Sequence, residues 1–163
     1  MCAVVLVEGI TDRIALEAVA TRLGRDLGAA GIEIVPIGGA QAIRRAAARH
    51  EGKRLVGLCD AGEERWFRRV LGDATYVCTA DLEDELIRAL GPDRVEEVVA
   101  GQGELETFRN FQNQPAWRGR AVGAQLRRWL QNGGRYRRYP PLLVEALEPE
   151  LIPQPLAGVL EHV

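Results

Sequence analysis

The first 91 residues alternate four times between a short aliphatic run and a segment with helical spacing, and this alternation narrows the choice of fold more than any other feature. The runs are short and rich in β-branched residues, as buried strands are. Strands that are linked by helical segments pair in parallel, with helices covering both faces of the sheet. The sequence therefore predicts an α/β fold with a four-stranded parallel sheet, whose strands lie at residues 4–7, 32–37, 55–59 and 75–78.

Helices are expected between and after these strands. Apolar residues recur at helical spacing from Leu16 to Leu27, so the first helix is expected to continue to Gly28 and Gly31. After residue 91 the strand pattern stops, and the rest of the chain has helical patterns separated by proline-rich connections. We therefore expect a single domain over residues 1–163, with an α/β core at 1–91 and a helical extension packed on it at 92–163.

Composition excludes several classes of protein. The longest aliphatic run, residues 3–7, is far too short to cross a bilayer, and no secretory signal is readable at the start. The three cysteines form no CxxC pair, which argues against a zinc site or a disulfide framework and fits a reducing compartment. We expect a cytoplasmic protein without a membrane partner, and we interpret the cysteines as structural.

Three of the four expected strands end at a carboxylate. Glu8 follows the first strand, Asp60 the third and Asp81 the fourth, whereas the second ends at Gly38-Gly39. Ligands of open parallel sheets bind outside the carboxyl ends of the strands. Converging carboxylates repel one another unless a cation lies among them, and oxygen ligands suit Mg²⁺ or Mn²⁺. The pattern predicts a metal site that can activate water in phosphoryl transfer.

A second interpretation explains most of these acids without a metal. Asp12, Asp81, Glu83 and Asp84 all lie in the first turns of expected helices, where the helix dipole favours an acid by about 0.3–1 kcal/mol. Asp81 is also a suitable N-cap. Glu8 is different, because a glutamate that ends an aliphatic strand caps nothing and is disfavoured in strands. The metal hypothesis therefore depends on acids occurring at three strand ends that meet at one edge. Asp12, taken by itself, fits either interpretation.

One span in the second half of the chain is basic and free of acids. Residues 107–144 contain no acid but have eight arginines, interleaved with aromatic residues. Arginines that neutralise phosphates beside stacking aromatics are typical of nucleic-acid binding. We predict phosphate contacts in the run GGRYRRYPP, whose glycines and prolines are expected to prevent a regular helix, through Arg135, Arg137 and Arg138. The tryptophans of this span are more simply explained as core residues.

Three segments in order, VVLVEGITDRIALEAVATRLG, GLCDAGEE and ADLEDEL, resemble the TOPRIM domain of OLD-family nucleases. The resemblance covers about residues 3–91 and implies a TOPRIM/Rossmann-like sheet in a DNA-cleaving protein. It also implies two divalent ions, Mg²⁺ or Mn²⁺, and a catalytic role for Glu8 and Asp60. By this resemblance, the metal ligands are Glu8, Asp12, Asp60, Asp81 and Glu83.

The sequence departs from the family pattern in three respects. The DxD motif reads Asp60-Ala61-Gly62, so that only Glu63 or Glu64 is available as a substitute ligand. No lysine follows Lys53, which leaves an arginine such as Arg135, Arg137 or Arg138 to replace the lysine that these nucleases use. OLD proteins also carry an ATPase, but this sequence has no GxxxxGK[ST] motif, so ATP hydrolysis would need a separate partner.

The first hypothesis is therefore an OLD-like TOPRIM endonuclease, which cleaves phosphodiesters with a divalent metal and acts on DNA in preference to RNA. The alternative is a catalytically weakened TOPRIM module that binds metal and nucleic acid or serves a partner ATPase or nuclease. The missing second aspartate and the missing lysine favour this alternative. A purely structural or dimerising role is the third hypothesis.

Overall fold

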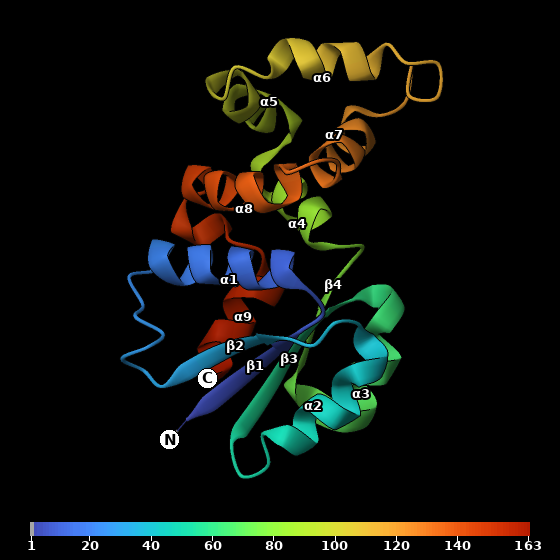
Figure 1. Ribbon diagram of the computed structural model, residues 1–163. Helices are drawn as coiled ribbons and strands as arrows, with labels where there is room; N and C mark the ends of the chain where they lie inside the picture. The colour runs from blue at the N-terminus through green and yellow to red at the C-terminus, as the bar shows by residue number, and fades with distance from the viewer. Residues whose placement is uncertain (1) are drawn as a thin grey trace.

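The structure is a computed structural model that describes residues 2–163, in which four parallel strands form one sheet in the order β2-β1-β3-β4 (Figure 1). All four strands lie where the aliphatic runs predict them, with ends that differ by one residue at most. The predicted α/β fold class is therefore confirmed. The strands are β1 (Ala3–Val7), β2 (Ile32–Pro36), β3 (Arg54–Asp60) and β4 (Thr75–Cys78).

The register brings the carboxyl ends of the strands to one edge of the sheet. Val7, the last residue of β1, pairs with Pro36 of β2 and with Leu58 of β3. Asp60 lies two residues farther along β3 and pairs with Cys78 at the end of β4. Residues that directly follow β1 and β4 therefore meet the end of β3 at the same edge.

Helices cover both faces of the sheet, as expected for parallel strands. Residues of β1 alternate between two buried clusters. Val4 and Leu6 pack with α2 and α3, whereas Val5 and Val7 pack with α1 and the C-terminal helices. The helices are α1 (Ile10–Arg22), α2 (Ile43–Arg49), α3 (Glu64–Leu71), α4 (Leu82–Leu90), α5 (Pro92–Gly101), α6 (Leu105–Gln112), α7 (Val122–Gln131), α8 (Arg135–Ala146) and α9 (Gln154–His162).

The helices after β4 form a layer that leaves the sheet and then returns to it. Figure 1 shows α4 to α7 extending beyond the carboxyl edge of the strands, while α8 lies along α1. The last helix, α9, packs on β3 and β4. One buried cluster continues from the sheet to Trp129 and Tyr139 in this layer. This continuity supports a single domain over residues 1–163, which stays a prediction.

The first helix ends earlier than predicted. It was expected to reach Gly28, but α1 stops at Arg22, and Gly24 adopts a left-handed φ of 68°. The amide of Gly24 bonds to the carbonyl of Thr21, and the amide of Arg25 bonds to that of Ala20. Glycine is the residue best suited to this helix end, because its left-handed conformation has no Cβ penalty.

The segment GGRYRRYPP was predicted to be irregular, and this prediction is wrong. Helix α8 begins at Arg135 and passes through Pro140 and Pro141. Both prolines lack the N–H that would bond to the preceding turn, which ordinarily disfavours them inside a helix. Tyr139, Pro140, Leu143 and Val144 are buried against the neighbouring helices, and this packing offsets the lost hydrogen bonds.

Within residues 2–163, no helix is both long enough and apolar enough to cross a membrane.

Candidate metal centre

Three carboxylates lie at the carboxyl edge of the sheet, each placed by a different strand. Glu8 directly follows β1, and its Oε1 accepts a hydrogen bond of 3.0 Å from the backbone amide of Asp60. Asp60 is the last residue of β3. Asp81 caps α4 just after β4, and its Oδ1 accepts a bond of 2.9 Å from the amide of Asp84. The hydrogen bond from Asp60 to Glu8 fixes the ends of β1 and β3 against each other.

Asp12 and Glu83 come from the first turns of the two helices that begin at this edge. The Oδ2 of Asp12 accepts a hydrogen bond of 3.0 Å from the amide of Gly9, so this aspartate does stabilise the start of α1. Glu83 is only 8% exposed, although it carries a carboxylate. Both interpretations of Asp12 therefore remain compatible, since a helix-capping residue can also line a site.

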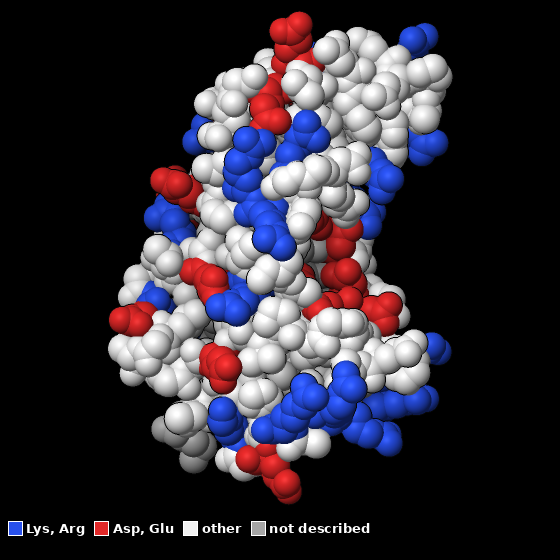
Figure 2. Space-filling view, in the orientation of Figure 1, with Lys and Arg blue, Asp and Glu red and all other residues white. Residues whose placement is uncertain are grey.

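All five predicted ligands line one hollow of about 380 Å³, together with Gly9, Gly39 and Gln131. Figure 2 shows acidic side chains gathered in a notch between the upper helices and the lower part of the molecule. The glycines leave this hollow open beside Glu8, because they carry no side chains. The five residues that the structure brings together are Glu8, Asp12, Asp60, Asp81 and Glu83.

Burial and repulsion by neighbouring acids make Glu8, Asp12, Asp60 and Glu83 harder to ionise. The pKa of Asp60 rises to about 8, first because of burial and then because of the charges of Glu8 and its other acidic neighbours. The pKa of Asp12 rises to about 6, again mainly because of burial. Burial also raises the pKa of Glu8 and that of Glu83. Raised pKa values of this kind are typical of functional sites. A cation bound among these carboxylates would lower their pKa values again.

Two residues of α7 contact the site and were not predicted from the sequence. Arg127 donates from Nε to Oδ2 of Asp81 at 2.7 Å, and Gln131 donates to the same oxygen at 2.9 Å. The two lie four residues apart, on one face of the helix. Their spacing is visible in the sequence, but nothing local indicates that this face meets Asp81, 46 residues before Arg127.

The sequence and the fold were compared with those of known proteins. Residues 2–55 match the family described as "Overcoming lysogenization defect protein-like, TOPRIM domain". The structure is similar to the C-terminal region of the Burkholderia pseudomallei OLD protein, with a TM-score of 0.68 and 16% identity, over 98% of this chain and 94% of that chain. The chain has the fold of an OLD-type TOPRIM domain. The resemblance seen in the sequence is thereby confirmed.

A second solved structure gives the same result for the fold. The C-terminal region of the Xanthomonas campestris pv. campestris OLD protein, phased with mercury, has a TM-score of 0.67 and 18% identity, with 98% of this chain and 93% of that chain covered. No curated protein matches the sequence. The similar fold includes the helices after β4, because nearly the whole chain is covered.

The two substitute ligands proposed for this TOPRIM site lie outside the five-carboxylate hollow. Glu63 lines a neighbouring hollow that shares Glu8 and Gly39 with it, and the charge of Glu63 helps to raise the pKa of Glu8. Glu64 forms an ion pair with Arg68 one turn later on α3. Of the two, only Glu63 is among the charges that raise the pKa of Glu8.

The predicted phosphate-binding arginines also lie outside this hollow. Arg135 and Arg138 both pair with Glu104, which precedes the acid-free span and accepts a further bond of 2.8 Å from Tyr139. The guanidinium of Arg135 lies 3.9 Å from the ring centre of Trp129. Arg137 contacts the hydroxyl of Tyr136 at 3.1 Å. Contact of these arginines with nucleic acid stays a prediction.

The donor set fits a hard divalent cation in its chemistry, because it consists of carboxylate oxygens. As the side chains stand, however, no group of three or more His, Cys, Asp or Glu residues within 2–163 could hold an ion together. Glu8, Asp12 and Asp81 already accept hydrogen bonds from the protein. A shared cation would therefore require some of these side chains to turn toward a common centre.

Proposed function

We propose that this chain is a divalent-metal-dependent endonuclease that cleaves phosphodiesters of nucleic acid, with DNA preferred to RNA. The observation that carries the proposal is the single hollow lined by Glu8, Asp12, Asp60, Asp81 and Glu83 at the carboxyl edge of a TOPRIM sheet. The match of residues 2–55 to the OLD-like TOPRIM family supports it. The three free cysteines, of which two are buried, are compatible with a reducing cytoplasm, where we place this activity.

We assign two ions of Mg²⁺ or Mn²⁺ to these five carboxylates, whose side chains would turn toward the ions on binding. When bound, such ions polarise a phosphodiester and lower the pKa of a water molecule. Glu8 and Asp60 are the proposed catalytic residues, because they lie side by side at the strand ends. Asp12, Asp81 and Glu83 complete the oxygen donors, and Arg127 fixes one oxygen of Asp81.

The raised pKa of Asp60 gives this residue a further role in the proposal. With a pKa of about 8, its carboxyl carries a proton at neutral pH unless a cation displaces that proton. Loading of the site therefore releases protons and becomes more favourable as the pH rises. We expect cleavage to depend on pH for the same reason.

The cleavage experiment uses supercoiled plasmid and single-stranded DNA, with Mn²⁺, Mg²⁺ or EDTA. We expect nicking with a divalent ion, and a loss of about a hundredfold or more in Glu8→Gln and Asp60→Asn. Glu17→Gln is the matched control, because Glu17 is an exposed carboxylate on α1 whose one ion pair within residues 2–163 is with Arg13. Equal cleavage by Glu8→Gln and the wild type would exclude this site as the catalytic centre.

The second candidate is a catalytically weakened TOPRIM module that binds metal and nucleic acid. It is favoured by the glycine at position 62, where the second acid of DxD is expected, and by the lack of a complete preformed ligand set within residues 2–163. Such a module could serve a separate ATPase, since the sequence has no P-loop. Binding of DNA by the wild type and by Glu8→Gln, without turnover in either, would favour this candidate.

A further inference from the structure

The helices α2 and α3 carry a set of arginines without acidic partners. Within residues 2–163, no carboxylate forms an ion pair with any of them. All are exposed, and α2 itself contains no acid. Figure 2 shows basic side chains gathered below the acidic notch, where Figure 1 places α2 and α3. We call this set the α2–α3 basic face, and it consists of Arg44, Arg45, Arg49, Arg65 and Arg69.

The arginine-rich span at 107–144 differs from this face in its pairing. Four of its eight arginines form ion pairs with acids from elsewhere in the chain. Glu96, Asp81 and Glu104 supply these acids. Ion pairs therefore neutralise half of the arginines in the span 107–144. The arginines of the α2–α3 basic face remain able to bind an external anion.

An aromatic ring orders part of the basic face. The guanidinium carbons of Arg65 and Arg69 lie 5.0 Å and 5.9 Å from the ring centre of Trp66. Cation–π contacts of this kind hold a guanidinium in place without neutralising its charge. Trp66 is itself only partly buried. Two cations are thus positioned in advance on the surface of α3.

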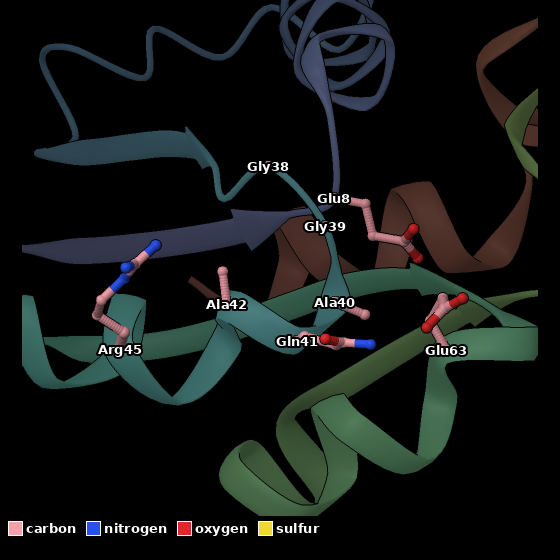
Figure 3. Close-up of a pocket in the computed structure, with 8 residues that line it drawn as sticks. All are labelled: Glu8, Gly38, Gly39, Ala40, Gln41, Ala42, Arg45 and Glu63. Carbon is pink, nitrogen blue, oxygen red and sulfur yellow. The ribbon is translucent and has the colours of Figure 1, made fainter.

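Three neighbouring hollows, each sharing lining residues with the next, lie between the carboxylates and this face. The carboxylate hollow shares Glu8 and Gly39 with a larger one of about 610 Å³, which Arg45 lines. Figure 3 shows Glu8 and Glu63 at one end of this larger hollow, Arg45 at the other and Gln41 between them. Gln41 also lines a third hollow of about 290 Å³, between α2 and α3, with Arg44, Trp66 and Arg69.

We propose that the α2–α3 basic face binds the phosphate backbone of the DNA strand on one side of the phosphodiester that reaches the carboxylates. This inference rests on the proposed function, because it takes the carboxylate hollow as the place of cleavage. A strand that leaves Glu8 along the connected hollows meets Arg45 first, and then Arg44 and Arg69. Arginine suits this contact, since its guanidinium binds phosphate through paired donors.

The test measures binding of a labelled single-stranded oligonucleotide by fluorescence anisotropy over a range of salt concentrations. The buffer contains Ca²⁺, and a gel after each titration verifies that the oligonucleotide is intact. The variant is Arg44→Ala/Arg45→Ala/Arg69→Ala, in which each lost side chain lines one of the hollows. The control is Arg54→Ala/Arg94→Ala/Arg118→Ala, which removes the same charge from exposed arginines that line none of the three.

We expect the α2–α3 variant to bind about tenfold or more weakly than the control, with an unchanged circular dichroism spectrum. The slope of log affinity against log salt should fall by about 2, because each lost phosphate contact removes about 0.7 for a single strand. Equal affinity and slope for the two triple variants would overturn this inference and leave the proposed function standing. A wild type that neither binds nor cleaves DNA would overturn both.

A polyanionic membrane surface is the competing partner for exposed arginines. Vesicles that contain phosphatidylglycerol, sedimented with each protein, distinguish it from DNA. Vesicle binding that is lost in the α2–α3 variant, with DNA binding unaffected, would overturn the assignment to DNA. Loss of DNA binding alone would support it.

Discussion

Among the carboxylates of the site, Asp60 is the residue at which burial and repulsion by neighbouring acids act most strongly on the pKa. It is tied to Glu8 through its own backbone amide, at 3.0 Å, so the two acids cannot move apart without breaking this bond. Burial, followed by the charges of Glu8 and Asp12, raises the pKa of Asp60 to about 8. The carboxylate form is therefore disfavoured in the folded protein at neutral pH. Burying a carboxyl group among other acids does not stabilise the fold, so stability alone is a poor explanation for an acid at this strand end.

The Asp60→Asn variant should be more stable than the wild type at pH 8. The folded protein binds the Asp60 proton more tightly than the unfolded chain does, so stability falls as the pH rises from the ordinary pKa of 3.8 to about 8. Asparagine does not titrate, and it should recover about 2 kcal/mol at pH 8, after allowance for solvent screening. Urea unfolding in EDTA at pH 5 and pH 8 measures the difference. An advantage of the same size at both pH values would contradict this account.

Arg127 competes with any cation for Asp81, because it donates to Oδ2 at 2.7 Å. The Arg127→Gln variant should therefore bind Mn²⁺ about fivefold more tightly, the size expected for loss of one partly exposed ion pair. Isothermal titration calorimetry checks this. Arg128→Gln is the matched control, since Arg128 is exposed and forms no ion pair within residues 2–163. Weaker binding by Arg127→Gln would instead indicate that the arginine holds Asp81 in its ligating position.

At the scale of elements, the local sequence predicted the strands of the sheet more accurately than the helices of the second half. Aliphatic runs between punctuating residues are enough to locate β1 to β4, because strands buried on both faces need such runs. Asp81 was correctly expected as the cap of α4, since its side chain needs only the amide of Asp84. In contrast, the helix through Pro140 and Pro141 forms because α8 packs along α1, a contact that local rules do not include.

The prolines of α8 provide a test of this explanation. Pro141 lies beyond the first turn of the helix and is only partly buried, so alanine should restore a backbone hydrogen bond without leaving a cavity. We expect Pro141→Ala to stabilise the protein by about 1 kcal/mol in urea unfolding. Pro155→Ala is the control, because Pro155 lies at the start of α9, where no such bond is lost. A stabilisation of the same size in both variants would contradict this explanation, because Pro155→Ala restores no such bond, and the freer unfolded chain of either variant acts in the opposite direction.

At the scale of the whole molecule, the sequence predicted the acids better than the arginines. Acids at the ends of parallel strands must share an edge, so Glu8, Asp60 and Asp81 could be grouped from the strand pattern alone. The arginines depend on pairing between distant elements. Glu104 is outside the acid-free span but folds against Arg135 and Arg138, whereas no sequence pattern distinguishes the exposed arginines of α2. A cluster of arginines in the sequence therefore does not tell how many of them are left unpaired on the surface.

Binding of a divalent ion should couple the site to the stability of the whole chain. An ion that binds only the folded protein stabilises it by about 2.7 kcal/mol at a hundredfold excess over Kd. For a chain of 163 residues, this corresponds to a rise in Tm of about 5–10 °C. We expect Mn²⁺ to produce such a rise in differential scanning calorimetry.

The effect of Mn²⁺ should be larger at pH 8 than at pH 6. The pKa values of Asp60 and Asp12, about 8 and about 6, mean that protons must leave the site as the ion enters, and fewer remain at the higher pH. Glu8→Gln should lose most of the Tm shift, whereas Glu17→Gln should keep it, because Glu17 is an exposed residue of α1. An equal shift in both variants would mean that Mn²⁺ binds elsewhere. Repulsion among the clustered acids would then lower the stability of the fold, with no bound cation to offset it.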